Sequence, residues 1–142
     1  MSANLIAKAS ATIAAPAARV WDALTKPEII KQYFFGTQAV SDWQEGSTLE
    51  FKGEWEGKPY LDKGIILRSE PKKIFQYTYL SSFSNLPDLP ENYANITYEL
   101  YEGNGETTLS VKQENIADEQ TRKHSEKNWS YVLQSLKDLL EK

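Results

Sequence analysis

Cysteine is absent from this 142-residue chain, and histidine occurs only once. Without cysteine the chain has no disulfide framework, no thiol nucleophile and no thiolate metal site. It also lacks an HExxH motif, a phosphate-binding glycine loop, a dinucleotide fingerprint and a Gly-x-Ser-x-Gly motif. The sequence therefore gives no signature of a common metalloenzyme, nucleotide-binding protein or serine hydrolase, and we expect neither a metal nor a cofactor.

Long apolar runs and an excess of positive charge are missing as well. No stretch approaches the roughly 20 apolar residues that a membrane span needs, and residues 1–10 lack the apolar core of a signal peptide. The formal net charge is −4, opposite in sign to the basic surface typical of nucleic-acid binding. We therefore expect a cytoplasmic protein that binds neither membranes nor nucleic acids.

The most regular stretch that is present covers residues 118–140. Its apolar side chains recur at steps of three and four, which predicts one stripe of a helix about 34 Å long. Asp118 is suited to cap its first turn, and no Gly or Pro follows within it. The stripe consists of Trp129, Val132, Leu133, Leu136, Leu139 and Leu140. Such a helix is stable mainly through what it packs against, so the chain must supply a broad apolar surface.

Alternation with period two supplies that surface. Residues 5–13 predict a half-buried strand of small side chains. Two short helices follow: one starts near Pro16, and Thr25 and Glu28 predict a capping box for the other. From Thr37 onward we expect five or six antiparallel strands, the clearest of them at residues 49–55.

The expected fold is of the α+β class: an antiparallel sheet whose apolar face is covered by the long C-terminal helix, in a single domain spanning residues 1–142. Residues 82–92 contain two prolines and no usable period, which is typical of a surface loop. The apolar tips of this loop, Phe83, Leu86 and Leu89, and its two prolines motivate the hypothesis that it acts as a lid.

Three segments resemble a known family. VWDALTKP at residues 20–27 and YFFG at 33–36 are similar to the N-terminal signature of the START-like (SRPBCC, helix-grip) superfamily. Gly64, Pro71 and the tyrosine-rich strand after it resemble the middle section of homologues of the activator of heat-shock-protein-90 ATPase. NWSYVLQSLK at 128–137 resembles the C-terminal helix of those homologues. Together these segments extend over essentially the whole chain.

The resemblance implies a helix-grip fold, in which a curved antiparallel β-sheet wraps around a long C-terminal α-helix, with two short helices after the first strand. It also implies a cavity that often accepts a small apolar molecule. Members of the superfamily include ligand carriers and polyketide aromatases or cyclases, and the name of the narrower family points to the stress response. Two features differ: no part of this chain corresponds to the activator's chaperone-binding N-terminal domain, and no obvious acid–base pair for a cyclase is present.

Ten residues are predicted to line the interior. They are Phe51, Trp55, Lys63, Ile65, Leu67, Tyr77, Tyr79, Tyr98, Trp129 and Leu133. The aromatic members form either a filled core or a pocket with a few polar groups, as in most ligand sites. Buried tyrosine hydroxyls need partners, which favours the pocket slightly. Lys63 alternates with the same period as Leu61, Ile65 and Leu67, so it belongs to the same face of the strand. It either points inward with them or reaches solvent near the start of the strand.

The leading hypothesis is a non-enzymatic domain that binds a small hydrophobic or amphipathic molecule between the sheet and the C-terminal helix. His124, about 140° around that helix from Trp129, is expected in solvent without a catalytic or metal-binding role. The first alternative is a co-chaperone that activates the heat-shock-protein-90 ATPase. A polyketide aromatase or cyclase is a third hypothesis, which requires a polar cluster deep in the cavity. We expect a monomer or a weak dimer.

Overall fold

The computed structural model describes residues 5–34, 36–81, 87–116 and 118–141. Strand β1 (Leu5–Ile13) is followed by two short helices, α1 (Ala17–Thr25) and α2 (Pro27–Tyr33). The remaining elements are β2 (Gln38–Ser41), β3 (Thr48–Trp55), β4 (Lys58–Glu70), β5 (Ile74–Tyr79), a short 3₁₀ helix η2 (Pro90–Asn92), β6 (Ala94–Gly103), β7 (Glu106–Ile116) and the long helix α3 (Glu119–Leu140).

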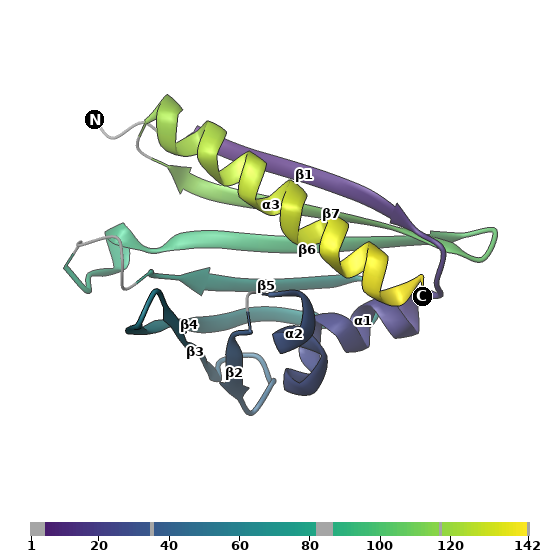
Figure 1. Cartoon of the computed structure of the whole chain (residues 1–142), viewed down its shortest axis with the longest axis horizontal. Coiled ribbons are helices and arrows are strands. Elements are labelled where there is room, and N and C mark those ends of the chain that lie inside the picture. Colours follow the sequence, from purple (N-terminus) through teal and green to yellow (C-terminus); the bar gives the residue numbers. More distant parts are fainter. Residues whose placement is uncertain (1–4, 35, 82–86, 117, 142) are drawn as a thin grey trace.

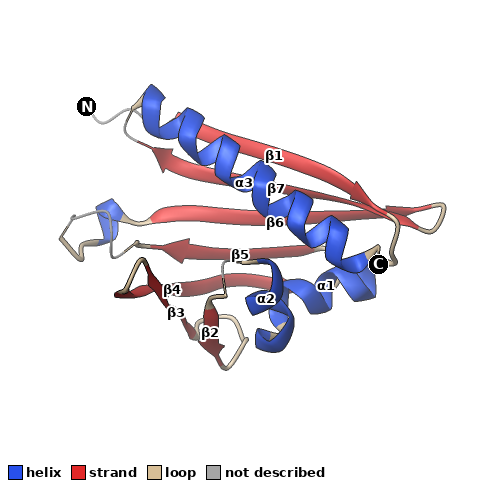
Figure 2. Cartoon of the chain, viewed as in Figure 1, coloured by secondary structure: helices blue, strands red, loops and turns tan. Residues whose placement is uncertain are grey.

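In the described residues, seven strands form one curved antiparallel sheet in the order β1-β7-β6-β5-β4-β3-β2. Because β1 pairs with β7, the first and last strands lie side by side at one edge. Helix α3 crosses the sheet, and α1 and α2 lie beside the C-terminal end of α3 (Figures 1 and 2). This is the helix-grip fold with the predicted order of elements.

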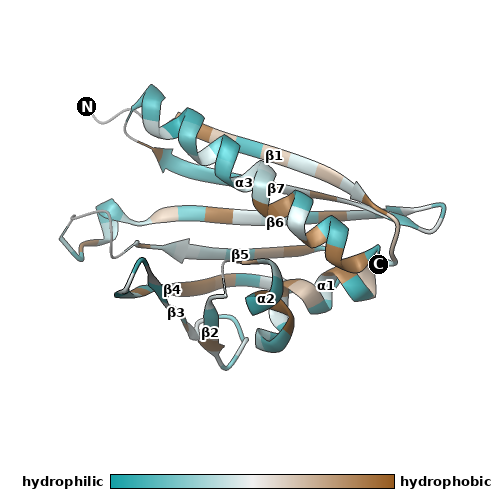
Figure 3. Cartoon of the chain, in the orientation of Figure 1, coloured by the Kyte–Doolittle hydropathy of each residue, from teal (hydrophilic) through white to brown (hydrophobic). Residues whose placement is uncertain are grey.

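Helix α3 has the predicted cap and the predicted buried stripe. The backbone N–H of Thr121 donates to Asp118 Oδ1 over 2.7 Å, and α3 begins at the next residue, Glu119. Trp129, Val132, Leu133, Leu136 and Leu140 are all buried. Figure 3 shows hydrophilic residues in the first turns of α3 and hydrophobic residues in its second half. The second half of α3 therefore carries most of the helix's contribution to the core.

Side chains of α3 and of the residue after it also accept hydrogen bonds from backbone N–H groups in and just after β1. The N–H of Lys8 donates to Glu126 Oε2 over 3.3 Å. Beyond the end of the strand, the N–H of Ala14 donates to Glu141 Oε2 over 2.9 Å. Exposed sheet edges are templates for pairing with other chains, and the Lys8 contact occupies one donor on this edge.

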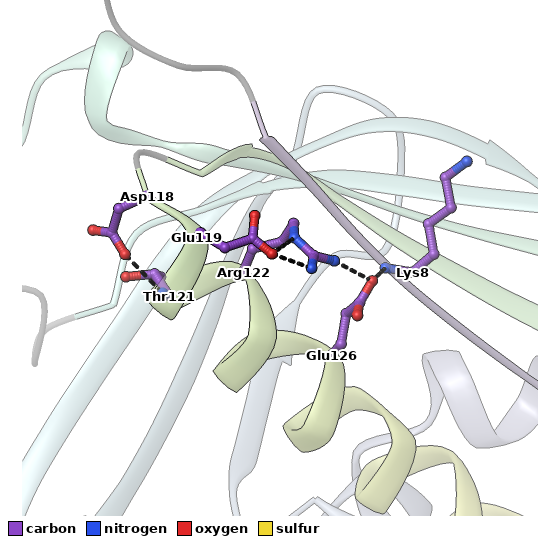
Figure 4. A network of polar contacts seen from close by, with 6 residues as sticks. All are labelled: Lys8, Asp118, Glu119, Thr121, Arg122 and Glu126. Carbon is purple, nitrogen blue, oxygen red and sulfur yellow. Dashed lines mark hydrogen bonds and ion pairs between the residues drawn. The ribbon is translucent and has the colours of Figure 1, made fainter.

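A short ionic network holds Glu126 in this position. Arg122 contacts Glu126 through Nη1 at 2.9 Å and also pairs with Glu119, one turn earlier on the same helix. Figure 4 shows that the network continues from the capped first turn of α3 to the backbone of β1. The first half of α3, which has few apolar contacts, is thus attached to the sheet by polar ones.

The predicted capping box at Thr25 is wrong. Helix α2 begins at Pro27 after Lys26, and no side chain caps it. Thr25 instead belongs to the last turn of α1, where its hydroxyl donates to the carbonyl of Trp21 over 2.9 Å. A threonine inside a helix commonly makes this bond to the preceding turn, and its hydroxyl is then not available to cap the next helix.

Candidate functional site

Aromatic rings fill the space between the sheet and the helices. Phe34 stacks on Phe51 with a centroid distance of 5.9 Å and lies 6.3 Å from Trp129. Tyr98 meets Trp129 edge to face at 5.9 Å. We call this set the aromatic interior; it comprises Tyr33, Phe34, Phe51, Phe75, Tyr77, Tyr98 and Trp129.

The aromatic interior contains a void of only about 10 Å³. A space of this size holds about one water molecule. The void is lined by Leu24, Ile30, Tyr33, Phe34, Trp43, Phe51, Phe75, Tyr77 and Tyr98. In this conformation the rings therefore pack as a filled core, and a ligand can enter only if a side chain moves.

Phe34 differs from the other rings in the element that carries it. It is the residue that ends α2, with φ −113° and ψ 59°, and its side chain is only partly buried. Its N–H donates to the carbonyl of Ile30, and its carbonyl accepts from Thr37. The next described residue, Gly36, has a φ of +70°. Phe34 thus enters the aromatic interior from a connecting segment, whereas Phe51, Tyr98 and Trp129 come from the centre of strands or α3.

The buried tyrosine hydroxyls have partners within the protein. Tyr33 donates to the carbonyl of Ala23 over 2.6 Å, and Tyr77 is hydrogen-bonded to Tyr98. In the described part of the chain no buried side-chain nitrogen or oxygen lacks a partner. Burial raises the pKa of Tyr33, Tyr77 and Tyr98, so all three hydroxyls remain neutral. Tyrosine content therefore does not require a ligand here, contrary to the argument from sequence.

A polar group of residues lies beside the aromatic interior. Asp62 is only 6% exposed and pairs across β3 and β4 with Phe51, whose side chain faces the interior. The hydroxyl of Tyr79 donates to Asp62 Oδ2 over 2.5 Å. Nearby on the same face, the hydroxyls of Tyr60 and buried Thr37 are 2.5 Å apart. We call Thr37, Tyr60, Asp62 and Tyr79 the polar end.

Tyr79 connects the polar end to the aromatic rings. Its ring centroid is 6.0 Å from that of Phe51. Burial raises the pKa of Tyr79 well above its usual value, and the negative charge of Asp62 raises it further. Tyr79 therefore stays protonated and donates, while Asp62 accepts.

The predicted inward orientation of Ile65 and Leu67 is wrong. Both side chains are 46% exposed, and Leu61 is 44% exposed, whereas Asp62 and Ile66 are buried. Opposite residues of an antiparallel pair share a face, and the β3–β4 register pairs Phe51 with Asp62. An inward Phe51 therefore turns Asp62, Gly64 and Ile66 inward and the odd-numbered residues between them outward.

Lys63 lies on the outer face with these residues. Its ammonium group pairs with Asp88, whose Oδ1 accepts the Tyr93 hydroxyl over 2.5 Å. Of the two alternatives for Lys63, the structure thus shows the solvent-facing one. The ion pair connects β4 to the segment that precedes β6, and it adds no polar group to the interior.

Six of the ten predicted lining residues do face the interior. Five are buried: Phe51, Tyr77, Tyr98, Trp129 and Leu133. The sixth, Tyr79, is partly buried at the polar end. The side chain of Trp55 lies outside the described part of the structure. So do Phe83 and Leu86 of the considered lid, whereas Leu89 is 44% exposed.

The set predicted from sequence missed Phe34 and Asp62. Phe34 belongs to no period-two segment, and the sequence pattern gives no sign that its ring reaches Phe51 on β3. Asp62 alternates with Leu61, Lys63 and Ile65, so the expectation that Ile65 faces inward excluded Asp62 from the interior, where the structure shows it buried. The turn at Glu56 and Gly57, with φ of 52° and 81°, could have shown which residues of β4 face inward. A two-residue turn of this kind fixes the register between the two strands that it joins, here β3 and β4.

Metal binding has no support in the described residues, where no group of three His, Cys, Asp or Glu side chains converges. His124 is exposed on α3, on the side predicted from its helical angle. None of the described helices is long and apolar enough to span a membrane.

Comparison with known proteins finds one family model, described as "Activator of Hsp90 ATPase homolog 1-like protein", that matches residues 14–141. A search of curated proteins finds no match. Among solved structures, the chain is similar to ChR145 from Cytophaga hutchinsonii, with 47% identity, coverage of 99% of this chain and 97% of ChR145, and a TM-score of 0.86.

Two more distant structures share the fold. The Aha1 dimer from Colwellia psychrerythraea is 20% identical, with 96% of each chain covered and a TM-score of 0.77. DynU16, a putative protein in the dynemicin biosynthetic locus, is 18% identical over 96% of this chain and 47% of its own, with a TM-score of 0.80.

Proposed function

This chain belongs to the family of activator of Hsp90 ATPase homolog 1-like proteins, and from that membership we propose that it binds a small aromatic or amphipathic molecule between the sheet and α3, without catalysing a reaction on it. The observation that carries the proposal is an interior lined by aromatic rings with a polar end at one side. Binding sites for small molecules usually have this composition, mostly apolar with a few fixed polar groups.

The ring of Phe34 occupies the place of the ligand's ring in the unliganded protein. Phe34 lies between Phe51 and Trp129, next to the 10 Å³ void, and it is carried by the segment at the end of α2. Moving this segment outward frees a ring-sized space without disturbing a strand pairing. The ligand then replaces the stacking contacts that Phe34 gives up, which limits the cost of opening.

A Phe34→Ala variant tests this proposal with a simple probe. Removing the ring enlarges the apolar space next to the 10 Å³ void, and apolar cavities of about 150 Å³ bind benzene. We expect benzene to produce a saturable change in tryptophan fluorescence, because Trp129 lies 6.3 Å from the position of the deleted ring. The wild-type protein should bind benzene more weakly, because Phe34 must first be displaced.

The matched control is Tyr101→Ala, which removes an aromatic ring that is 64% exposed on β6. This variant should respond to benzene as the wild-type protein does. A folded Phe34→Ala protein, verified by a cooperative urea transition, that shows no saturable response to benzene would contradict the proposal.

Activation of a chaperone ATPase is the second candidate function. The description of the matching family and the shared fold with the Colwellia Aha1 dimer support it, and the filled interior suits a protein that acts through its surface. The test adds the purified protein to Hsp90 and measures the rate of ATP hydrolysis, with heat-denatured protein as control. A dose-dependent rise in rate supports this candidate, and an unchanged rate over a wide range of concentrations removes it.

A further inference from the structure

We propose that the outer face of the sheet carries a second binding site, a groove across β1, β7 and β6 that recognises a sugar phosphate. We call it the outer groove; its volume is about 430 Å³, and its polar side chains are Lys8, Ser10, Glu99, Ser110 and Lys112. Buried Leu109 and Val111 alternate with the polar residues of β7, so the outer groove lies on the face that α3 does not cover (Figure 1). It shares no residue with the aromatic interior, so binding at one does not require binding at the other.

Two lysines face each other at one end of the outer groove. Lys8 of β1 and Lys112 of β7 are directly opposite across the two strands. Side chains in such a pair are about 5 Å apart at their Cβ atoms, and like charges there are destabilising. Among the described strand pairings this is the only one that sets two like charges opposite each other. An anion placed between the two ammonium groups would replace their repulsion by attraction.

The contacts that these lysines make within the protein leave them available to an anion. Lys8 forms no ion pair with any described residue, and its side chain extends away from Glu126, which accepts its backbone N–H (Figure 4). The ammonium group of Lys112 lies 3.7 Å from Glu114 Oε1, which is longer than a charge-assisted hydrogen bond. The side chain of Lys112 is also 39% exposed.

A phosphate monoester suits the lysine pair better than a carboxylate does. At neutral pH it carries a charge of about −1.5 to −2 and three strong acceptor oxygens. It can therefore contact both ammonium groups at once and balance both charges. A carboxylate brings a single negative charge, so it leaves part of the repulsion between the lysines in place.

The neighbouring row of side chains suits hydroxyl groups. Ser10, Ser110 and Glu99 are opposite one another on β1, β7 and β6. Each serine hydroxyl can donate and accept. The carboxylate of Glu99 accepts the Tyr101 hydroxyl over 2.9 Å and has acceptor capacity left for another donor. The negative charge of Glu99 disfavours a second phosphate in this row and favours hydroxyl groups.

The spacing of the two rows matches one small molecule that carries both kinds of group. They are two residues apart along each strand, which corresponds to about 7 Å. Neighbouring strands add about 5 Å in the perpendicular direction. A hexose with a phosphate on its exocyclic carbon therefore reaches the lysine pair with the phosphate while its ring hydroxyls lie over the serines and Glu99.

The experiment compares four probes: glucose 6-phosphate, glucuronate, glucose and inorganic phosphate. The first three share one ring and differ at the exocyclic carbon. Binding to the wild-type protein is followed by the chemical shifts of the backbone amides at neutral pH and low salt, because salt screens contacts between exposed charges. We expect saturable shifts in the outer groove with glucose 6-phosphate, and at least about fivefold weaker binding of the other three, as for the loss of one exposed ion pair.

Lys8→Gln removes one ammonium group and keeps the backbone N–H that donates to Glu126. We expect this variant to bind glucose 6-phosphate about fivefold more weakly than wild type. Lys52→Gln is the matched control, because it removes an exposed ammonium group from the outer face of β3, 3.9 Å from Glu50. The control should bind glucose 6-phosphate within about twofold of wild type.

Each alternative result overturns a named part of this inference. Glucose that binds as tightly as glucose 6-phosphate removes the role of the lysines, and an unchanged affinity of Lys8→Gln does the same. Glucuronate of equal affinity removes the preference for phosphate, and inorganic phosphate of equal affinity removes the sugar. Phe34→Ala should bind glucose 6-phosphate as wild type does, so a failure at the outer groove and a failure in the aromatic interior are told apart.

Discussion

Replacing Trp129 by alanine tests how α3 is held against the sheet. The indole is only 7% exposed, it packs edge to face on Tyr98, and its Nε1 donates to Gln113 Oε1 over 2.8 Å. Burying roughly 200 Å² at about 25 cal/mol per Å² corresponds to about 5 kcal/mol. Alanine keeps part of this burial and the site relaxes in part, so we expect a loss of about 3–5 kcal/mol in the free energy of unfolding.

The assay is urea unfolding followed by far-ultraviolet circular dichroism, because the mutation removes a fluorescent reporter. Trp129→Phe is the matched variant, since it keeps an aromatic ring but loses the N–H that binds Gln113. It should lose less, about 1–2 kcal/mol. A loss below about 1 kcal/mol for Trp129→Ala would refute the packing of α3 described above.

Five further substitutions test three features of the fold by the same urea assay. Asp118→Ala should lower the free energy of unfolding because α3 loses its cap. The hydrogen bond from the Thr121 backbone lowers the pKa of Asp118 in the folded state. The stability that the charged cap contributes is therefore complete above about pH 4 and is lost as the pH falls through that lowered pKa. The difference in unfolding free energy between wild type and variant should disappear over that range. Gly64→Ala should lower the free energy of unfolding by more than about 2 kcal/mol, because a Cβ there meets a backbone carbonyl of β5. Gly103→Ala, with open space around it, should lower it by less than about 1 kcal/mol. Equal losses would contradict the close approach of β5 to Gly64. Ile66→Ala should lower the free energy of unfolding by about 2–5 kcal/mol, because Ile66 is buried, and exposed Ile65→Ala should lower it by less than about 1 kcal/mol. A larger loss for Ile65→Ala than for Ile66→Ala would mean that Ile65 faces the core.

The sequence predicted the long helix well because its signals are local. The apolar stripe of residues 118–140 is uninterrupted, and Asp118 stands directly before it. The inner face of β3 was equally readable at Leu49 and Phe51, because charged residues alternate with them. In both segments only one face is apolar, so the pattern of residues shows which face packs against the core.

Strand β4 was misread because both of its faces carry large apolar residues. Ile66 is fully buried while Ile65 is 46% exposed, so alternation in hydropathy does not choose between the two orientations. Pairing does choose, through the turn at Gly57 and the inward Phe51. Gly64 agrees with this choice, since only a residue without a Cβ allows the backbone of β5 to approach so closely.

The amount of free space in the interior was beyond sequence reasoning for a different reason. The composition shows how many rings the chain has, but the void is set by where each ring points. Phe34 decides the outcome here, and its position depends on the short connection after α2 rather than on any periodic pattern. The same dependence makes Phe34 the side chain whose displacement the proposed function requires.

A nuclear Overhauser experiment on the wild-type protein saturated with benzene tests directly whether a ligand ring replaces Phe34. We expect contacts from the benzene protons to Phe51 and Trp129, together with the loss of the Phe34–Phe51 contact that the 5.9 Å stacking gives in the free protein. Probe contacts confined to the outer face of β4, for example to Ile65, or an intact Phe34–Phe51 contact at saturation, would contradict it.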